Sequence, residues 1–502
     1  MEPDAPLQVV AAMKPMTPDR DAPLLSVGRN CWRIEQAERV GLIVDAANYF
    51  RAVKDAFLKA RHSIYLIGWD FDTRIKFEPE GATLEGPNTL GALLRWLVKH
   101  RPGLHVYILK WDLGALMALG RGTTPFAVLG WTTNRRLHFK LDGMHPPGAA
   151  HHQKIVVVDD VLAFCGGIDM TADRWDTSEH LDDDPRRVRP SGRAYGPWHD
   201  ATAAVDADAA RALGELARER WKAATGHPIE PPPRSQAAIW PDGVEPVFGP
   251  VKLGIARTIP RHGERAEARE VERLTLDAIA AARKTIYCES QYFASRAVAE
   301  AMAERLSEAD GPEIVVINPE SADGFLESAV MDSARSRLFD LVRKADRHQR
   351  FRIHTPVTEG GQPIYVHAKL LIVDDRLFRI GSSNFNNRSM GFDTECDLVI
   401  EAGPDDRALR RQIETIADDL LAEHLGCDRG IVRQARQDRD GSLIDAIDAL
   451  RGSGRTLQPL EPQPINAVEE QLAENDLLDP EKPPRFVKSF LSSLRTRAGS
   501  FR

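Results

Sequence analysis

The chain has 502 residues, of which 42% are hydrophobic and 28% are charged, as in an ordinary globular protein of two or three domains. Its 66 basic and 74 acidic side chains give a net charge of −8, which disfavours a general nucleic-acid-binding protein. The five cysteines are scattered and form neither a disulfide framework nor a CxxC metal pattern. No apolar run approaches the ~18 residues of a membrane-spanning helix, so we expect a cytoplasmic protein. Secretion without a signal peptide stays open.

In chain order, an acidic, Pro-interrupted leader without a signal-peptide pattern precedes two stretches in which helical and strand patterns alternate. In the first stretch, the helical pattern 46–60 is followed by the apolar strand pattern 63–69. Alternation of this kind predicts helices packed on a sheet. The predicted segments are a flexible leader (1–25), a first half (26–227), a Pro-rich linker (228–250), a second half (251–403), a helical extension (404–455) and a loose tail (456–502).

The pattern His-x-Lys-x-x-x-x-Asp occurs twice, at residues 152 and 367. Both copies are followed at the same offset by a glycine, Gly166 in the first and Gly381 in the second. Two copies with a shared offset indicate an internal duplication that brings two histidines and two lysines to one site. The motif residues are His152, Lys154 and Asp159 in HHQKIVVVDD, and His367, Lys369 and Asp374 in VHAKLLIVDD.

Each motif lies on a β-branched apolar run, which predicts a strand buried on both faces, and side chains alternate along a strand, so the histidine and lysine of one copy share a face. Histidine titrates near neutrality, with an ordinary pKa of ~6.5, and lysine neutralises phosphate oxygens. Two such pairs suit attack on a phosphorus atom. Asp159 and Asp374 fall on the opposite face, where a supporting role at a turn fits better than direct chemistry. A metal site ranks lower, because no carboxylate or cysteine lies at ligand spacing. We expect neither a metal nor a cofactor.

The paired motifs resemble those of the phospholipase D superfamily over roughly residues 31–401. The stretches GGIDMTADRWD, GPWHDATAAVDADAA, IYCESQYF and GSSNFNNRSMGFDTE are most similar to the phosphatidylcholine-type phospholipases D. The resemblance implies two similar α/β-sandwich halves, each a mixed sheet flanked by helices, with pseudo-two-fold symmetry and one shared active site. A helical C-terminal extension would follow them.

By the same resemblance, His152 attacks phosphorus to form a phosphohistidine and His367 is the general acid and base. This assignment of the nucleophile rests on analogy. The implied supporting residues are Lys154, Lys369, Asn384 and Ser382 on the phosphate, and Asp176 and Glu395 as the carboxylates that orient the histidines.

The implied function is metal-independent hydrolysis, or transfer to an alcohol, of the phosphodiester of a glycerophospholipid. The alternatives are a phosphatidyltransferase of the cardiolipin synthase type, a nuclease or other phosphodiesterase of the superfamily, and an inactive scaffold that binds anionic lipid. We expect a monomer that binds no nucleic acid. The last 22 residues carry six basic side chains and one acidic one, with apolar residues at helical spacing. The segment 482–502 is therefore either a helix that binds an anionic membrane surface, which would make the protein peripheral, or a helix docked on the protein.

Overall fold

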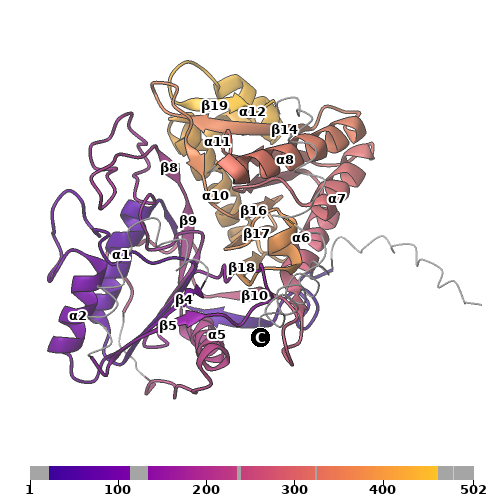
Figure 1. Ribbon diagram of the computed structural model, residues 1–502. Coiled ribbons are helices and arrows are strands. Elements are labelled where there is room, and N and C mark those ends of the chain that lie inside the picture. Colours follow the sequence, from indigo (N-terminus) through magenta and orange to yellow (C-terminus); the bar gives the residue numbers. More distant parts are fainter. Residues whose placement is uncertain (1–21, 113–133, 235–238, 323–324, 462–478, 480–502) are drawn as a thin grey trace, which may run out of the picture.

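The computed structural model describes residues 22–112, 134–234, 239–322, 325–461 and 479. Two mixed β-sheets form the centre of the molecule, and helices cover their outer faces (Figure 1). The predicted α/β fold, with two halves built on mixed sheets flanked by helices, is confirmed. Most of the predicted leader, residues 1–21, and the basic segment 482–502 lie outside the described residues.

The first sheet has seven strands in the order β2-β9-β7-β6-β3-β4-β5. Its central strands are runs of β-branched and other apolar residues that are buried on both faces, as in β6. The strands β3, β4 and β5 run parallel to one another, and the remaining neighbours are antiparallel. The bounds are β2 Val40–Val44, β3 Ser63–Gly68, β4 His105–Trp111, β5 Leu137–Asp142, β6 Ile155–Val158, β7 Leu162–Gly166 and β9 Ala201–Asp206.

The second sheet has ten strands, with β1-β10-β18-β17-β16-β12-β13-β14-β19 in order and β11 paired to β10. The bounds are β1 Arg33–Ala37, β10 Val251–Ile259, β11 Ala268–Arg269, β12 Thr285–Glu289, β13 Glu313–Ile317, β14 Phe351–Val357, β16 Leu370–Val373, β17 Leu377–Gly381, β18 Glu395–Glu401 and β19 Thr456–Pro459. A separate pair, β8 Trp198–His199 and β15 Tyr365–Val366, joins one segment of each half.

The second sheet repeats the first strand for strand. The order β10-β18-β17-β16-β12-β13-β14 matches the complete first sheet, and the parallel pairs occur at the same two places. Contacts between the halves are also reciprocal, because β7 contacts β18 and its counterpart β17 contacts β9. Reciprocal contacts of this kind are what a two-fold arrangement produces. The duplicated motif is thus part of a duplicated topology.

Apolar helix faces complete the layers. Helix α1 buries Tyr49, Phe50, Val53 and Phe57, which recur at helical spacing, against the outer face of the first sheet. Helices α6, α7 and α8 cover the outer face of the second sheet, and α5 and α10 pack in the core that joins the sheets. The helix bounds are α1 Ala46–Lys59, α2 Leu90–His100, α5 Ala207–Thr225, α6 Glu270–Ala281, α7 Arg296–Ser307, α8 Phe325–Ala345, α9 Asn387–Gly391, α10 Arg407–Leu425, α11 Arg429–Gln437 and α12 Leu443–Leu450.

Two segments differ from the sequence-based expectation. Strand β1 lies at the start of the predicted first half, yet it pairs with β10 at the edge of the second sheet. Strand β19 pairs with β14, so the prediction of a loose tail from residue 456 is wrong at its start. Both strands find a hydrogen-bonding edge far away in sequence, which local pattern does not reveal. Within the described residues, none of the helices combines the length and apolarity needed to span a bilayer.

Candidate active site

Each motif histidine lies just before a central strand, β6 or β16, and its backbone is bound by the other half of the chain. The N–H of His152 donates to the carbonyl oxygen of Thr394 at 3.1 Å, and the N–H of His367 donates to that of His199 at 2.8 Å. The histidines and lysines therefore occupy an extended segment ahead of the strand rather than the strand itself. This placement brings both copies of the motif to the junction of the halves.

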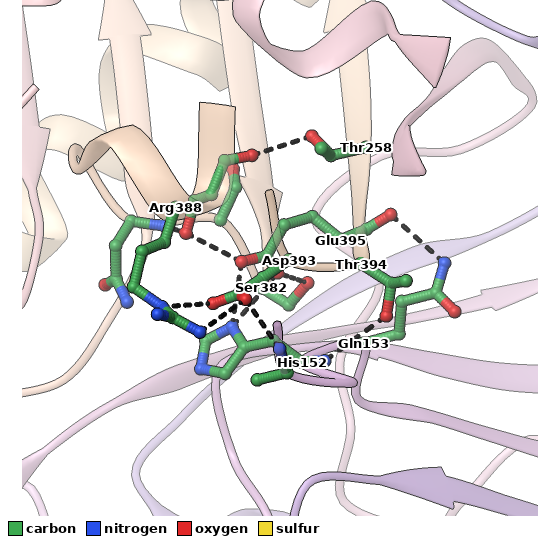
Figure 2. Close-up of polar contacts among 12 residues, drawn as sticks. His152, Gln153, Thr258, Ser382, Arg388, Asp393, Thr394 and Glu395 are labelled. Atoms are coloured by element: carbon green, nitrogen blue, oxygen red, sulfur yellow. Dashed lines mark hydrogen bonds and ion pairs between the residues drawn. The ribbon is translucent and has the colours of Figure 1, made fainter. Parts of the chain in front are cut away.

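The side chain of His152 is fixed by a carboxylate of the second half (Figure 2). Its Nδ1 lies 2.9 and 3.0 Å from the two oxygens of Glu395, the first residue of β18. Two hydroxyls hold this carboxylate in turn, Ser382 at 2.5 Å and Ser389 at 2.6 Å. With Nδ1 engaged by the carboxylate, Nε2 is the ring nitrogen left for chemistry.

His367 has the corresponding arrangement, with the two halves exchanged. Its Nδ1 lies 2.6 Å from Oδ2 of Asp200, which stands immediately before β9 in the first half. Strand β9 is the counterpart of β18, so Asp200 and Glu395 occupy corresponding places. Each histidine thus takes its carboxylate from the half that does not supply the histidine, and neither half contains a complete site.

The prediction that Asp176 orients a motif histidine is therefore wrong. The Oδ2 atom of Asp176 lies 2.9 Å from Nδ1 of His180 and accepts the backbone N–H of Trp198 at 2.8 Å. Its other oxygen lies 3.1 Å from the guanidinium of Arg187. Asp176 belongs to a buried network behind His367, whereas Glu395 stands where it was expected, at a motif histidine.

The motif lysines are buried beside their histidines. Lys154 is 5% exposed and Lys369 is 1% exposed, and each donates a hydrogen bond to the carbonyl oxygen of the histidine two residues earlier. The Nζ atom of Lys154 also lies 3.2 Å from Oδ2 of Asp169. Burial lowers the pKa of Lys369 to about 7, against the opposing effect of Asp200. Buried ammonium groups are costly, so an anion between them would be strongly favoured.

Burial also shifts the histidines and their carboxylates. The pKa of His152 is held well below its usual value by burial and then by Lys154 and Lys369. The pKa of His367 is lowered in the same way by burial and then by Lys369 and Arg174. Burial raises the pKa of Glu395 to about 7 and that of Asp200 to about 7. The site therefore favours neutral imidazoles at neutral pH, the form of histidine that can attack an electrophile.

The motif aspartates hold turns and take no part in this cluster. Asp159 accepts the backbone N–H groups of residues 61–63 at 2.7 to 2.8 Å. Asp374 accepts those of residues 283–285 at 2.7 to 2.9 Å. Both residues have a left-handed backbone, with φ of 54° and 55°. They are better described as turn residues that fix the start of β3 and of β12 than as members of the catalytic set.

The two expected phosphate contacts from the second half differ from each other. Ser382 donates its hydroxyl to Glu395 and accepts the N–H of Cys396 at 3.0 Å, so it positions the carboxylate, and its contact with the phosphate stays a prediction. Asn384 is 2% exposed, and its Oδ1 has no hydrogen-bond partner in the described part of the chain. Its role on the phosphate stays a prediction.

Other residues of the site escaped the motif analysis. The ring of Trp198 lies 5.2 Å from that of His367, 4.5 Å from that of Tyr365, and 4.2 Å from the guanidinium carbon of Arg174. Asp200 follows Trp198 in the stretch WHD, which was noted but not assigned. The signal that could have found Asp200 is its place before an apolar strand, β9, as Glu395 begins β18.

Comparisons with known proteins agree with this geometry. A family model described as "Cardiolipin synthase, PLD-like domain" matches residues 275–418, which include the second motif. Phospholipase D alpha 1 of Carica papaya is 24% identical, and the alignment covers 74% of this chain and 63% of the relative. Phospholipase D A of Dictyostelium discoideum is also 24% identical, over 75% of this chain and 33% of the relative. The chain therefore spans less than two thirds of either relative.

Among solved structures, phosphatidylserine synthase of Haemophilus influenzae Rd KW20 has a similar fold. The TM-score is 0.54 at 13% sequence identity, and the superposition covers 82% of this chain and 95% of the synthase. This likeness concerns the fold. The paired motifs, the duplicated sheet and the relatives together establish the family: the chain belongs to the phospholipase D superfamily.

Proposed function

We propose that the protein is a phospholipase D, which cleaves the phosphodiester of a glycerophospholipid and transfers the phosphatidyl group to water or to an alcohol. The observation that carries this proposal is the crossed pair of His–carboxylate contacts, His152 with Glu395 and His367 with Asp200, next to two buried lysines. Two oriented imidazoles and two cations are what a two-step displacement at phosphorus requires.

In the first step, Nε2 of one histidine attacks phosphorus, and the bond from phosphorus to the head-group oxygen breaks. The other histidine gives its Nε2 proton to the departing alcohol, and the lysines neutralise the non-bridging oxygens. The phosphodiester anion offsets the lysine charges that hold the imidazole pKa down, so substrate binding favours the protonated acid. The carboxylate at Nδ1 keeps the ring oriented and stabilises the imidazolium.

In the second step, the histidine that gave its proton to the alcohol is neutral, and it removes a proton from water or from an alcohol. The oxygen attacks phosphorus, the P–N bond breaks, and phosphatidic acid or a phosphatidyl-alcohol leaves. By analogy with the family, we assign the nucleophile to His152 and the acid and base to His367. Peripheral contact with a membrane, which this substrate requires, belongs to the same proposal.

A phosphatidyltransferase is the second candidate, because the match to the cardiolipin synthase family model and the fold likeness to a phosphatidylserine synthase both favour it. It shares the phosphohistidine and differs only in its preferred acceptor. A superfamily nuclease is less favoured, since the net charge is −8.

The test uses vesicles of phosphatidylcholine, phosphatidylethanolamine and phosphatidylglycerol with a trace of primary alcohol, with and without brief exposure to EDTA. We expect phosphatidic acid and phosphatidyl-alcohol from the wild type, and neither from His152→Ala or His367→Ala. The variant His100→Ala, on an exposed helix end, is the matched control. Product only when glycerol or phosphatidylglycerol is the acceptor would favour the transferase, and no turnover of any lipid would refute both.

The nucleophile is identified with an activated phosphodiester whose leaving group needs no protonation. Under these conditions His367→Ala should still accumulate a phosphohistidine, detectable by mass spectrometry, whereas His152→Ala should form none. The reverse pattern would exchange the two roles.

A further inference from the structure

Behind His367 lies a second cluster of histidines and carboxylates that the proposed chemistry does not use. Asp45, His180 and His199 come from the first half, and Glu423 comes from helix α10. The two histidines and Asp45 are 0% exposed. One ligand atom from each of the four residues can be chosen so that all four lie within 4.8 Å of one another.

The potential ligand atoms lie close enough together to surround one ion. Glu423 Oε1 lies 2.8 Å from His199 Nδ1 and 3.2 Å from His180 Nε2. The oxygens of Asp45 lie 3.6 Å from His199 Nδ1 and 3.7 Å from His180 Nε2. Metal–ligand distances of 2.0–2.2 Å imply tetrahedral edges of about 3.4 Å, and these four contacts, two of which involve different oxygens of Asp45, run from 2.8 to 3.7 Å on either side of that value. We propose that Asp45, His180, His199 and Glu423 bind one divalent metal ion.

The outer contacts of the cluster are those of a metal centre. A metal-binding histidine usually donates its second ring N–H to a carboxylate, which fixes the tautomer. The second nitrogen of His180 lies 2.9 Å from Asp176, and that of His199 lies 2.8 Å from Glu289. Both rings therefore turn the required nitrogen towards Asp45 and Glu423.

An independent sign is an unsatisfied buried oxygen. Asp45 Oδ2 is buried and, among the described residues, accepts no hydrogen bond, although buried carboxylate oxygens are normally paired. A cavity of about 530 Å³ is lined by His180 and Glu423 together with Arg455 and Glu359. The cavity gives an ion a route to the cluster from the surface.

The ligand chemistry selects the ion. Two imidazoles and two carboxylates suit Zn²⁺ first, and Mn²⁺ or Fe²⁺ after it, whereas Ca²⁺ and Mg²⁺ prefer all-oxygen sites. A second group, His199, Glu289 and His424, shares His199. There, however, Glu289 also accepts the hydroxyl of Tyr287 at 2.6 Å, and the part of the chain that the structure describes offers that group no fourth ligand.

The ion would position the catalytic apparatus without touching substrate. Asp45 and Asp200 are hydrogen-bonded to each other, since Asp45 N–H donates to the carbonyl oxygen of Asp200 at 2.8 Å and Asp200 N–H donates to Oδ1 of Asp45 at 3.3 Å. Asp200 in turn holds His367. Because Glu423 belongs to α10 in the helical extension and the other three ligands belong to the first half, the ion would also tie the extension to the first half behind this contact.

The alternative is a cluster without a metal ion, in which both histidines are protonated and donate hydrogen bonds to the carboxylates. The two cases are separated on the full-length protein by stripping it with dipicolinate, adding Zn²⁺ or Co²⁺, and measuring metal content and Tm. We expect about one retained equivalent of Zn²⁺ per chain and a Tm that rises with free Zn²⁺. The Co²⁺ form should show the visible absorption of a four-coordinate site.

Variants locate the ion. Glu423→Gln and Asp45→Asn should lose the retained metal and the Zn²⁺-dependent rise in Tm. His152→Ala should keep both, which excludes binding at the motif histidines. His145→Gln should keep both as well, because His145 lies 2.9 Å from Asp112 but belongs to neither ligand group.

The proposal is overturned by a wild-type protein that retains no Zn²⁺ and shows no shift in Tm, a result that needs no variant to fold. It is also overturned if both Glu423→Gln and Asp45→Asn retain Zn²⁺, or if His152→Ala loses it. None of these readouts depends on lipid turnover, so they are independent of the proposed function.

Discussion

Nδ1 of His152 lies 2.9 Å from Glu395, a residue 243 positions further along the chain and on the opposite sheet. His367 repeats the relationship in reverse, with Asp200 as its partner. The duplication therefore did more than double a motif. It exchanged the supporting carboxylates between the halves, so that the orientation of each imidazole depends on the packing of one half against the other.

The first prediction separates Asp200 from Asp176. Asp200→Asn keeps the shape of the side chain but removes the charge that orients His367, so kcat should fall by about 10²–10⁴ with little change in KM. Asp176→Asn leaves the His367 contact intact but weakens the buried contacts to His180 and Arg187, so it should mainly lower Tm. Steady-state kinetics and thermal unfolding of both variants check this. Equal losses of kcat would contradict it.

The second prediction concerns Glu395 and pH. Because its pKa is about 7 in the folded protein and about 4.5 otherwise, the unfolded chain releases this proton first as pH rises. The wild type therefore loses stability between pH 4.5 and 7, and above pH 7 this loss is constant at up to about 3 kcal/mol. Glu395→Gln has no such loss, so its stability relative to wild type should rise through this window while kcat falls.

Urea unfolding of both proteins at several pH values from 5 to 8 measures that difference directly. Other titrating groups are common to the two proteins and largely cancel. A stability difference that does not change with pH would show that the carboxylate at residue 395 is ionised throughout.

The third prediction concerns the turn aspartates. Asp159→Ala leaves three backbone N–H groups without their acceptor, at a cost of about 2–4 kcal/mol. Asp374→Ala should cost less, because Asp374 is partly exposed whereas Asp159 is buried and water can replace the lost acceptor only at the former. Asp159→Asn, which tolerates the left-handed backbone, is the conservative control. Activity per folded molecule should stay close to wild type in all three, and a selective loss of kcat would return these residues to the catalytic set.

The fourth prediction concerns Gly167. A methyl group there would overlap Oδ1 of Asp200 and lie 3.1 Å from the carbonyl oxygen of His367. Gly167→Ala should therefore displace Asp200 and lower kcat by about 10²-fold, the usual effect of a shift near 1 Å in a catalytic group. Gly249→Ala is the matched control, since its added methyl group would meet nothing within 4 Å. Identical kinetics for the two variants would show that Asp200 tolerates the shift.

The sequence predicted the parts of the site that are local. The apolar run of each motif predicted a buried central strand, and the structure has β6 and β16 there, each of which begins just after the motif lysine rather than including it. Strands of this kind depend on a few neighbouring residues and on strand patterning, which a sequence displays directly. Glu395 was instead implied by the resemblance to the family, because its contact with His152 joins residues 243 positions apart.

The errors lie where a contact joins distant segments. Asp176 was implied by the resemblance to the family, 24 residues after His152 as Glu395 lies 28 residues after His367, but a longer connection places Asp200 at the corresponding strand start. Offsets count residues along the chain, whereas correspondence in a sheet depends on strand order. For the same reason β1 and β19 were missed, since each is an edge strand whose partner is set by tertiary packing.

The crossing of the carboxylates has a consequence for synthesis of the chain on the ribosome. Strand β1 leaves the ribosome first, but its partner β10 is made only after the whole first half. Glu395, which orients His152, is synthesised later still. A nascent or truncated chain that ends before residue 395 has one histidine without its carboxylate, so the chemistry begins only when nearly the entire sheet pair has been made. We therefore expect the site to stay inactive until residue 395 has been made and packed beside His152.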